Sequence, residues 1–557
     1  MTGLFLEDRQ SSYLDEPEDR YQEMLASSRA FVINQFGLSA FVWEDGGYRA
    51  KTFNYYIFPR PFEGADKRFV CQASSMAFLA SCGFDFNKAI YDGVGYMTVV
   101  SRDAKLAAID RPPRERSEVL VSKPEDVAFV GQLVAEVEAW RQAEDPSLEL
   151  PAVNAYQRLL QYQELRRLGN APGFYVERAA NGDGRPALRL IRASPEQAAA
   201  WEAEQRQKRI EAIHDAAGFA AVMEAMRDSG KPMIGHNLAF DLAYSLHSFA
   251  RELPSSWPEY KELVHRWFPG GVYDTKHLSG KLRPELFEDT SLGPLHDGLC
   301  KGQLQEQVDA FLRSQTAADT KASSDSMSDG EVAELPAVDH APGFERYKGV
   351  DTEAYAHEAG FDAFMTGAVF ACLLRLYEAT SGATPAAGQQ PDLAAVEDRC
   401  WRMHLSRSDL PYAALQGEDA EADRSHVFWI SGWEASERVY GGELARRLAD
   451  SGLGQLRGTS VDGGKGVLLE VADAEAVPGA LDVMRKAFPT WTVQEYSAFA
   501  AYRAELRAAA AAAAAEERAA AAARRSNKRP RVEVEAAAPQ AGGGSDSEGW
   551  MSRCSVM

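Results

Sequence analysis

The stretch His236-Asn237-Leu238-Ala239-Phe240-Asp241 decides the fold of this chain. The apolar residues 232–235 before it read as a short buried strand, and Asn237 carries the amide side chain typical of a helix N-cap. Apolar residues then recur at helical spacing, namely Leu238, Leu242, Leu246 and Phe249. The segment therefore predicts a strand that passes directly into a helix, with Asp241 in the first helical turn.

A second stretch, His357-Glu358-Ala359-Gly360-Phe361-Asp362, opens a predicted helix that runs to about Glu378. His357 and Asp362 are five residues apart, so on an ideal helix their side chains would diverge by about 140°. A helix that begins near Gly360 leaves His357 in the preceding loop, where it can face the same site as Asp362. We therefore expect Asp241, His357 and Asp362 to meet at one end of a single sheet.

The segments around these stretches alternate between predicted strands and helices, which predicts an α/β core. Residues 29–43 and 51–58 read as strands, and Asp45-Gly46-Gly47 between them supplies the turn of a hairpin. Another strand at residues 271–273 ends in Asp274-Thr275-Lys276. Residues 314–345 are polar and acidic, and we expect them to be a disordered insertion.

Two further units are predicted outside this core. A helix at 155–168, strands at 174–177 and 187–191 and a charged helix at 195–213 form a compact insertion. Residues 424–500 show the order βαββαβ, which is the pattern of an RNA-recognition fold.

Composition bounds these interpretations. A chain of 557 residues is too long for one hydrophobic core and should divide into roughly three or four domains. The net charge of −22 argues against polyanion binding by the whole surface and leaves a local basic groove open. No stretch resembles a signal peptide or a membrane helix, and the six scattered cysteines lack metal-ligand spacing.

The chemistry that Asp241, Asp362 and His357 would support is phosphodiester hydrolysis. Carboxylates suit hard ions such as Mg²⁺, and two such ions roughly 3.5–4 Å apart activate water and hold the leaving oxygen. A histidine with a pKa near neutrality can accept the proton of the attacking water. A lone Asp on a helix is more often a solvated face or a cap, and His-x-x-x-x-Asp is common by chance, so spacing alone leaves both readings open.

Longer motifs carry a resemblance to a known family. In chain order they are Phe36-Gly37-Leu38, Phe53-Asn54-Tyr55-Tyr56-Ile57-Phe58-Pro59, Phe78-Leu79-Ala80, Gly83-Phe84-Asp85-Phe86-Asn87-Lys88, Ile234-Gly235-His236-Asn237, Asp274-Thr275-Lys276, Thr290-Ser291-Leu292 and His357-Glu358-Ala359-Gly360. These motifs closely resemble the poly(A)-specific ribonucleases, which are deadenylases of the DEDD type with a general-base histidine.

The resemblance implies an α/β fold: a ribonuclease-H-like mixed-sheet exonuclease core, a small Arg-xxx-His-type single-strand-binding insertion, an RNA-recognition-like βαββαβ domain and a tail. The implied ranges are 1–130 and 214–405 for the core, 131–213 for the insertion, 424–500 for the RNA-recognition-like domain and 501–557 for an alanine-rich, disordered tail.

The same resemblance implies the site residues. Asp241 and Asp362 would be metal ligands and His357 the general base. The positions that match those near bound adenylate are Thr2, Gly3, Leu4, Met76, Phe78, Asn237, Lys276 and Leu292. The family's cofactor is Mg²⁺, with two ions expected, and its activity removes poly(A) tails from RNA and releases AMP. Family membership further implies a homodimer in nucleus and cytoplasm.

One departure affects catalysis. The family's first motif, an Asp-x-Glu pair, has no counterpart here, because Thr2-Gly3-Leu4 matches the turn just after it. Glu7 and Asp8 are not substitutes, since adjacent strand residues point to opposite faces. We therefore expect an N-terminally truncated, catalytically incomplete chain with an exposed strand edge near residues 31–38. The alternative is a noncatalytic RNA-binding or dimerising protein derived from the nuclease.

Two further departures concern RNA binding. The stretch at 465–471 lacks the aromatic residues that normally stack on bases. Trp429, Trp433 and Trp491 are aromatic alternatives, for which we expect core roles. The insertion has Arg166-Arg167-Leu168-Gly169-Asn170, without the histidine that defines the Arg-xxx-His type.

The C-terminal tail carries two address-like motifs. A compact basic run predicts a nuclear localisation signal through Arg524, Arg525, Lys528, Arg529 and Arg531, with a solvated basic tail as the alternative. Cys554-Ser555-Val556-Met557 fits a prenylation box at Cys554. One lipid chain without an adjacent basic cluster anchors weakly, so we expect no stable membrane association.

Overall fold

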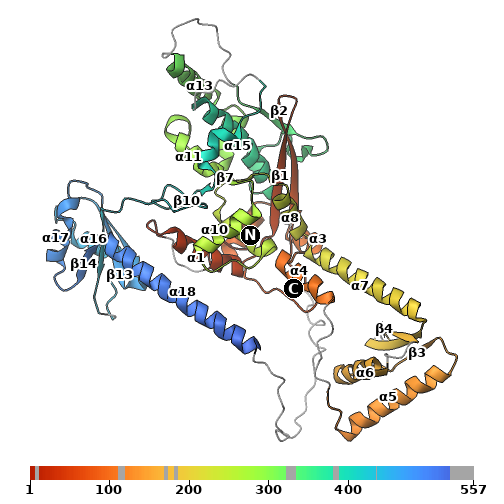
Figure 1. Ribbon diagram of the computed structural model, residues 1–557. Coiled ribbons are helices and arrows are strands. Elements are labelled where there is room, and N and C mark those ends of the chain that lie inside the picture. The colour runs from red at the N-terminus through yellow and green to blue at the C-terminus, as the bar shows by residue number, and fades with distance from the viewer. Residues whose placement is uncertain are drawn as a thin grey trace, which may run out of the picture. The chain divides into compact units, whose positions relative to one another are not determined.

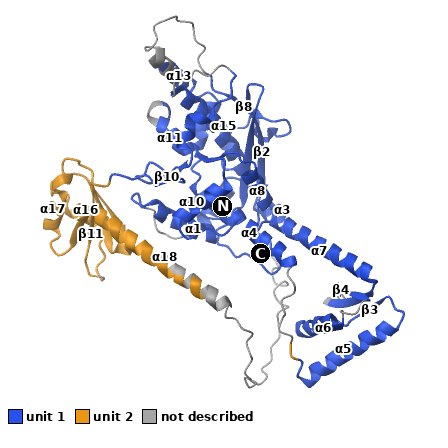
Figure 2. Ribbon diagram, in the orientation of Figure 1, with its two compact units in different colours: residues 1–114, 121–423 blue, residues 115–120, 424–557 orange. Residues whose placement is uncertain are grey.

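The computed structural model describes residues 1–6, 12–110, 119–168, 173–180, 186–320, 334–380, 388–434 and 436–526. The described residues divide into two compact units (Figure 2). Unit 1 lies within residues 1–423, and unit 2 comprises residues 424–526 together with 119–120.

The first sheet of unit 1 is built on a hairpin (Figure 1). Strands β1 (Gln35–Glu44) and β2 (Gly47–Tyr56) pair antiparallel, and the turn residues Asp45 and Gly46 have φ of 52° and 78°. Two consecutive positive φ values are the type I′ turn that suits the twist of a hairpin. The predicted hairpin is therefore confirmed, although residues 29–34 were wrongly placed in its first strand, because helix α1 (Pro17–Ala30) ends there.

A third strand, β8 (Ala337–His340), pairs parallel with β2 and starts opposite Gly47. The prediction that residues 314–345 are a disordered insertion is wrong for this segment, since β2 satisfies its backbone hydrogen bonds. It is also wrong for residues 314–320, where the backbone belongs to helix α13 (Gln305–Thr320). Residues 321–333 lie outside the described part of the chain.

The second sheet of unit 1 has the order β10-β9-β7-β6. Strands β6 (Met233–Gly235) and β7 (Val272–Asp274) run parallel, and the short strands β9 (Arg402–Met403) and β10 (Ala413–Ala414) extend the sheet. Strand β6 leads into α9 (Ala239–Ser245), which continues as the π-helix η1 (Leu246–Ala250). The predicted strand-to-helix passage is confirmed, and its four helical-spaced apolar residues are all buried.

Two helices fill the centre of unit 1. The segment α9–η1 packs with α1 and α10 (Trp257–Trp267) in the largest hydrophobic cluster. Helix α15 (Ala359–Thr380) lies against β1 and β2 and contributes eight of the nineteen buried residues of a second cluster. The remaining helices of the core are α2 (Ala73–Ser81), α3 (Phe86–Asp92), α4 (Val99–Ile109), α8 (Ala220–Asp228), α11 (Thr275–Leu286), α12 (Leu292–Cys300) and α14 (Thr352–Tyr355), with 3₁₀ turns η2 (Glu345–Tyr347) and η3 (Leu393–Arg399).

Helix α15 also corrects one compositional expectation. By length and hydropathy it is the one described helix apolar enough to cross a membrane, whereas the sequence predicted none. In its apolar 18-residue window, 78% is buried within the protein, as in core helices. Its apolar character is explained by packing on several sides at once.

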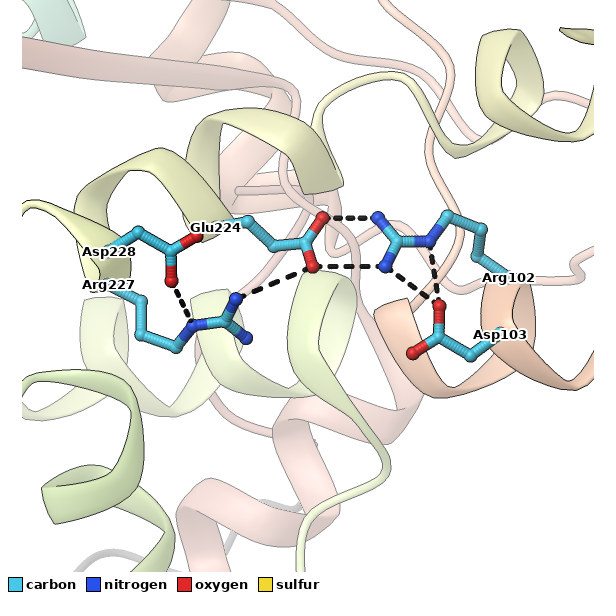
Figure 3. A network of polar contacts seen from close by, with 5 residues as sticks. All are labelled: Arg102, Asp103, Glu224, Arg227 and Asp228. Carbon is cyan, nitrogen blue, oxygen red and sulfur yellow. Dashed lines mark hydrogen bonds and ion pairs between the residues drawn. The ribbon is translucent and has the colours of Figure 1, made fainter.

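Helices α4 and α8 are joined by a polar network (Figure 3). Glu224 of α8 accepts hydrogen bonds from both terminal nitrogens of Arg102 of α4, with an Nη2 to Oε1 distance of 3.0 Å. Arg227, whose guanidinium lies 3.6 Å from Glu224, is bonded in turn to Asp228. The Arg102–Glu224 pair is bidentate and mostly shielded from water, so it ties the two helices together more firmly than an exposed ion pair would.

The insertion forms its own small cluster within unit 1. Its elements are α5 (Pro124–Gln142), β3 (Ser147–Glu149), α6 (Ala155–Leu168), β4 (Phe174–Ala180), β5 (Pro186–Arg192) and α7 (Pro195–Ala217), with the sheet order β3-β5-β4. The apolar core is drawn from α5, α6, β5 and the residue after β3, and consists of Leu133, Val137, Trp140, Leu150, Leu165, Leu188 and Leu190. Its assignment as a single-strand-binding domain stays a prediction, and Gly169 and Asn170 lie outside the described residues.

Unit 2 is a four-stranded antiparallel sheet with three helices. In chain order the elements are β11 (Val427–Ser431), α16 (Gly441–Arg447), β12 (Leu456–Val461), the 3₁₀ turn η4 (Asp462–Gly464), β13 (Gly466–Val471), α17 (Val477–Ala487), β14 (Thr492–Glu495) and α18 (Tyr496–Ser526). The sheet order is β12-β13-β11-β14. Its core lies between the sheet and helices α16 and α17.

Candidate active site

Asp241 lies in the first turn of α9, just beyond the carboxyl end of β6. Its side chain reaches solvent, and within the described chain no hydrogen bond reaches its carboxylate. The protein packed around it disfavours the charged form and raises the pKa of Asp241 to about 6. The amino group of Met1 opposes this shift, while the charges of Asp362 and Asp274 add to it, so Asp241 lies close enough to both carboxylates for their charges to act on it.

Asp362 lies in the first turn of α15 and faces the same site. Its Oδ1 accepts a hydrogen bond of 3.3 Å from the backbone N–H of His357. Burial raises the pKa of Asp362 to about 6, and this hydrogen bond and the His357 charge act in the opposite direction. The structure thus brings together Asp241, Asp362 and His357, as the sequence predicted. The prediction that they meet at one end of a single sheet is wrong, because Asp241 follows β6 of the second sheet, whereas the start of α15 is bonded to β1 and β2 of the first sheet.

The start of α15 is fixed by the β1–β2 hairpin. The backbone N–H groups of Ala359 and Gly360, which have no partner inside the helix, donate to the side chains of Gln35 (3.0 Å) and Asn54 (3.1 Å). A Cβ on Gly37 would lie 1.7 Å from the carbonyl oxygen of Ala359. The hairpin therefore positions Asp362 through caps and a close approach that only glycine permits.

His357 precedes this helix in an unusual backbone conformation. Its φ is 71°, a region that non-glycine residues seldom adopt. Its side chain is exposed, and its ring lies edge-on to Phe78 of α2 with 4.9 Å between ring centroids. Phe78 is itself 49% exposed, so an aromatic surface borders the histidine.

Asp274 has a different environment at the end of β7. It is 1% exposed, and its two oxygens accept four backbone N–H bonds from Asn237, Leu238, Lys276 and His404, at 2.8 to 3.4 Å. Burial raises the pKa of Asp274 to about 6, and these four hydrogen bonds oppose the shift. The sequence marked Asp274 as part of a motif without giving it a role. The structure shows it holding the β6–α9 loop against β7.

The prediction that Asn237 is the N-cap of α9 is wrong. Asn237 has φ of 56° and α9 begins at Ala239, with Leu238 in the N-cap position and no side-chain cap. Asn237 instead accepts a 3.0 Å hydrogen bond from Ser406. A residue with positive φ lies outside the helix, and asparagine tolerates this conformation better than most residues.

The predicted contact residues at the N-terminus lie beside the site. Thr2 is buried, bonding through Oγ1 to Val70 and Val32, and the carbonyl of Gly3 accepts a hydrogen bond from Tyr244, one turn beyond Asp241. Leu4 is 39% exposed. The expectation of an open strand edge near residues 31–38 is wrong at residues 31–33, because they are buried and the backbone of Thr2 bonds to Val32.

The other predicted contact residues, Met76, Lys276 and Leu292, differ from one another in their surroundings. Met76 shares α2 with Phe78 and is half-buried, and Lys276 lies near enough to His236 to help burial lower the pKa of that histidine to about 4. Leu292 packs against the hydrophobic clusters around α15, which is a core position. A role in substrate binding stays a prediction for all three.

A metal ion is the group that this site implies. Asp241 and Asp362 supply mutually repelling carboxylates with unoccupied lone pairs, which suit a divalent cation. Asp274 cannot join them while four N–H groups occupy its oxygens. Among the described residues no group of three or more potential ligands gathers, so they fit one side of a cation site and do not complete a two-ion centre.

Glu7 and Asp8 lie outside the described residues, as do Lys528, Arg529, Arg531 and Cys554 of the tail. Only the backbone of Arg524 and Arg525 is described.

Taken together, the fold and site define an α/β protein with one carboxylate at the start of each of two helices and a histidine beside one of them, an arrangement typical of metal-dependent nucleases. A family model described as CAF1 family ribonuclease matches residues 1–370, and the chain belongs to this family.

Individual relatives are similar over most of the chain. The poly(A)-specific ribonuclease PARN of Xenopus laevis is 30% identical over 448 residues, covering 76% of this chain and 65% of that protein. The protein of the same name from Bos taurus is 28% identical over 88% of this chain and 74% of its own length. The poly(A)-specific ribonuclease PNLDC1 of Mus musculus is 27% identical over 76% of this chain and 75% of its own length. The resemblance predicted from the motifs is confirmed, and the chain spans about 65% of the length of the frog and human PARN proteins.

Proposed function

We propose that this protein is a 3′-exoribonuclease that removes poly(A) from RNA by hydrolysis and releases AMP. The observation that carries the proposal is that Asp241 and Asp362 lie near each other and beside His357. The pKa of each aspartate is raised, and the charge of Asp362 contributes to the shift at Asp241. Membership of the CAF1 ribonuclease family supports the reaction class. The preference for poly(A) rests on the names of the relatives.

Each residue has a defined role in this proposal. Asp241 and Asp362 bind divalent cation, for which we propose Mg²⁺ and two ions in the complete centre. His357, which is exposed and held by its contacts with Asp362 and Phe78, accepts the proton of the attacking water. Phe78 and Leu4 offer apolar surface on which a terminal base can stack, and such stacking tolerates any base.

Because the described residues do not complete a two-ion centre, the proposal is tested with end-labelled oligoadenylate and Mg²⁺ on the chain extended by an Asp-x-Glu segment before Met1. We expect Asp241→Ala and Asp362→Ala each to lower AMP release by at least about 100-fold, because each removes a group that acts on the reacting atoms. His357→Ala should lower the rate, because it removes the proposed acceptor of the proton of the attacking water. Asp482→Ala, an exposed carboxylate on α17, is the matched control. Retention of more than a few per cent of activity by either site variant contradicts the ligand assignment.

A second function is favoured by one observation. Because Asp274 is occupied and the described residues gather no third free ligand, the chain as given fits a noncatalytic poly(A)-binding or dimerising protein as well. This alternative expects oligoadenylate binding with no tail shortening at any Mg²⁺ concentration. Detection of AMP from the purified chain ends it.

The remaining proposals concern assembly and location. From the family resemblance we propose a homodimer, tested by sedimentation of the purified chain. We propose nuclear and cytoplasmic localisation, with the basic run as the nuclear signal. Replacing Arg524 and Arg525 with alanine should reduce nuclear accumulation of a fluorescent fusion, and an unchanged distribution rejects that assignment.

A further inference from the structure

The two faces of the unit 2 sheet have different coverings. Residues of β11 and β13 alternate between faces, and Phe428, Ile430, Val467 and Leu469 point into the core under α16 and α17. Trp429 therefore points to the opposite face, where its register partner on β13 is Leu468. This second face is the one that βαββαβ domains normally leave open to nucleic acid.

Helix α18 covers this second face. It contacts β11 and β14, and Trp429 stacks on Tyr502 with a centroid distance of 5.2 Å and an interplanar angle of 23°. Phe499 packs beside the same tryptophan at 5.6 Å and is 6% exposed. Tyr502 thus occupies the position of a base on an aromatic platform.

A few polar contacts hold the helix in place. Arg503 donates to Asp462, in the turn between β12 and β13, at 2.8 Å. At the start of α18, the guanidinium of Arg424 lies over the ring of Tyr496 and bonds to its hydroxyl. Beyond residue 507 the described side chains of the helix are exposed, so only about three turns hold the cover.

Within the described chain, the side chain of Trp429 lacks a hydrogen bond under its helical cover. Its indole N–H is buried without a hydrogen-bond partner among the described residues, whereas the N–H of Trp433 donates to the carbonyl of Gly464. A buried donor without an acceptor weakens the covered state, because the same N–H would be hydrated or bonded once exposed. Stacked rings and a few polar contacts therefore hold α18 over the sheet, and the described part of the helix offers no acceptor to the indole N–H of Trp429.

We propose that α18 is a displaceable cover over a single-stranded RNA-binding face centred on Trp429, and that RNA competes with Tyr502 for this tryptophan. Release of α18 exposes an aromatic ring and an indole N–H that a base and its phosphate can use. The inference adds a second RNA site to the proposed function and is independent of the carboxylate centre.

The test measures binding of a short oligouridylate to the full chain in chelator, so that neither metal nor adenosine preference contributes. Tyr502→Ala should raise the affinity about fivefold, because it removes the stacking that RNA must displace. Arg503→Ala should also raise it, although the loss of a positive charge by itself lowers affinity for RNA. Leu506→Ala, at an exposed position on the same helix, is the matched control and should have no effect.

Photo-crosslinking locates the new contact. The crosslink to the peptide that contains Trp429 should increase in both variants, and Trp429→Ala placed in either variant should abolish the gain in affinity. Unchanged or reduced affinity in both variants overturns the proposal. So does loss of hydrogen-exchange protection in β13 of the Arg503→Ala protein, because α18 would then be part of the domain core.

Discussion

The carboxylate at the end of β7 and the carboxylates at the starts of α9 and α15 form an instructive comparison. The surrounding protein raises the pKa of all three aspartates to about 6. Asp274 accepts four backbone hydrogen bonds, whereas one reaches Asp362 and none reaches Asp241 within the described chain. A raised pKa therefore does not by itself mark a ligand, and the free lone pairs separate a carboxylate that holds the fold from carboxylates that can hold a cation.

The largest expected effect follows from removing the occupied carboxylate. Asp274→Ala should destabilise the protein by about 4 kcal/mol, because four buried N–H groups lose their acceptor. Chemical denaturation measures this directly. Asp241→Ala, in the same protein, should leave stability in chelator unchanged or higher, since it relieves repulsion. Equal destabilisation by both variants breaks the distinction between the two kinds of site.

A smaller loss is expected where the hairpin meets α15. Gly37→Ala should cost about 3 kcal/mol, because the new Cβ would overlap the carbonyl of Ala359 and push the start of α15 away. Gly131→Ala, in the middle of α5, is the matched control: its new Cβ would meet no atom within 4 Å, and the change should stabilise by about 0.5–1 kcal/mol. If the first variant is as stable as the second, β1 does not fix the start of this helix.

The pH dependence of stability should reflect all three aspartates. A carboxyl whose pKa rises from 3.8 to about 6 on folding binds protons more tightly in the native state, so its contribution falls as pH rises from about 4 to 6. In chelator, Asp362→Asn should reduce this pH-dependent loss of stability more than Asp241→Asn does. The reason is that the charge of Asp241 is better screened by solvent. Urea midpoints across this pH range provide the measurement. A fall of unchanged size in the double variant assigns the titration to other groups.

The sequence predicted which residues lie at the site, but it did not predict which residues hold the site in place. Asp241 was predicted at a strand-to-helix transition, and His357 and Asp362 at the opening of a helix, which are local features with periodic apolar residues beside them. The structure confirms these positions, and the functional roles stay predictions. The roles of Gln35, Asn54 and Asp274 were missed, because each acts on backbone N–H groups of a segment distant in the chain. No local pattern marks such a partner.

The same reason explains the errors in the fold. The four residues of β8 are a strand only because β2 pairs with them in parallel, and their polar flanks gave no sign of this. Asn237 has the side chain of an N-cap, but the hydrogen bonds of Asp274 hold its loop in a conformation that moves the N-cap one residue later, to Leu238. Tertiary contacts outweighed local preference at both places.

The central claim is that Asp241 and Asp362 face one cation site while Asp274 does not. The most direct measurement is the shift in melting temperature produced by millimolar Mg²⁺ or Mn²⁺. A cation at about ten times its Kd should raise the melting temperature of the unaltered chain by about 1–2 °C. Asp241→Asn and Asp362→Asn should abolish this rise, and Asp482→Asn should keep it. A rise of the same size in both site variants would contradict the account.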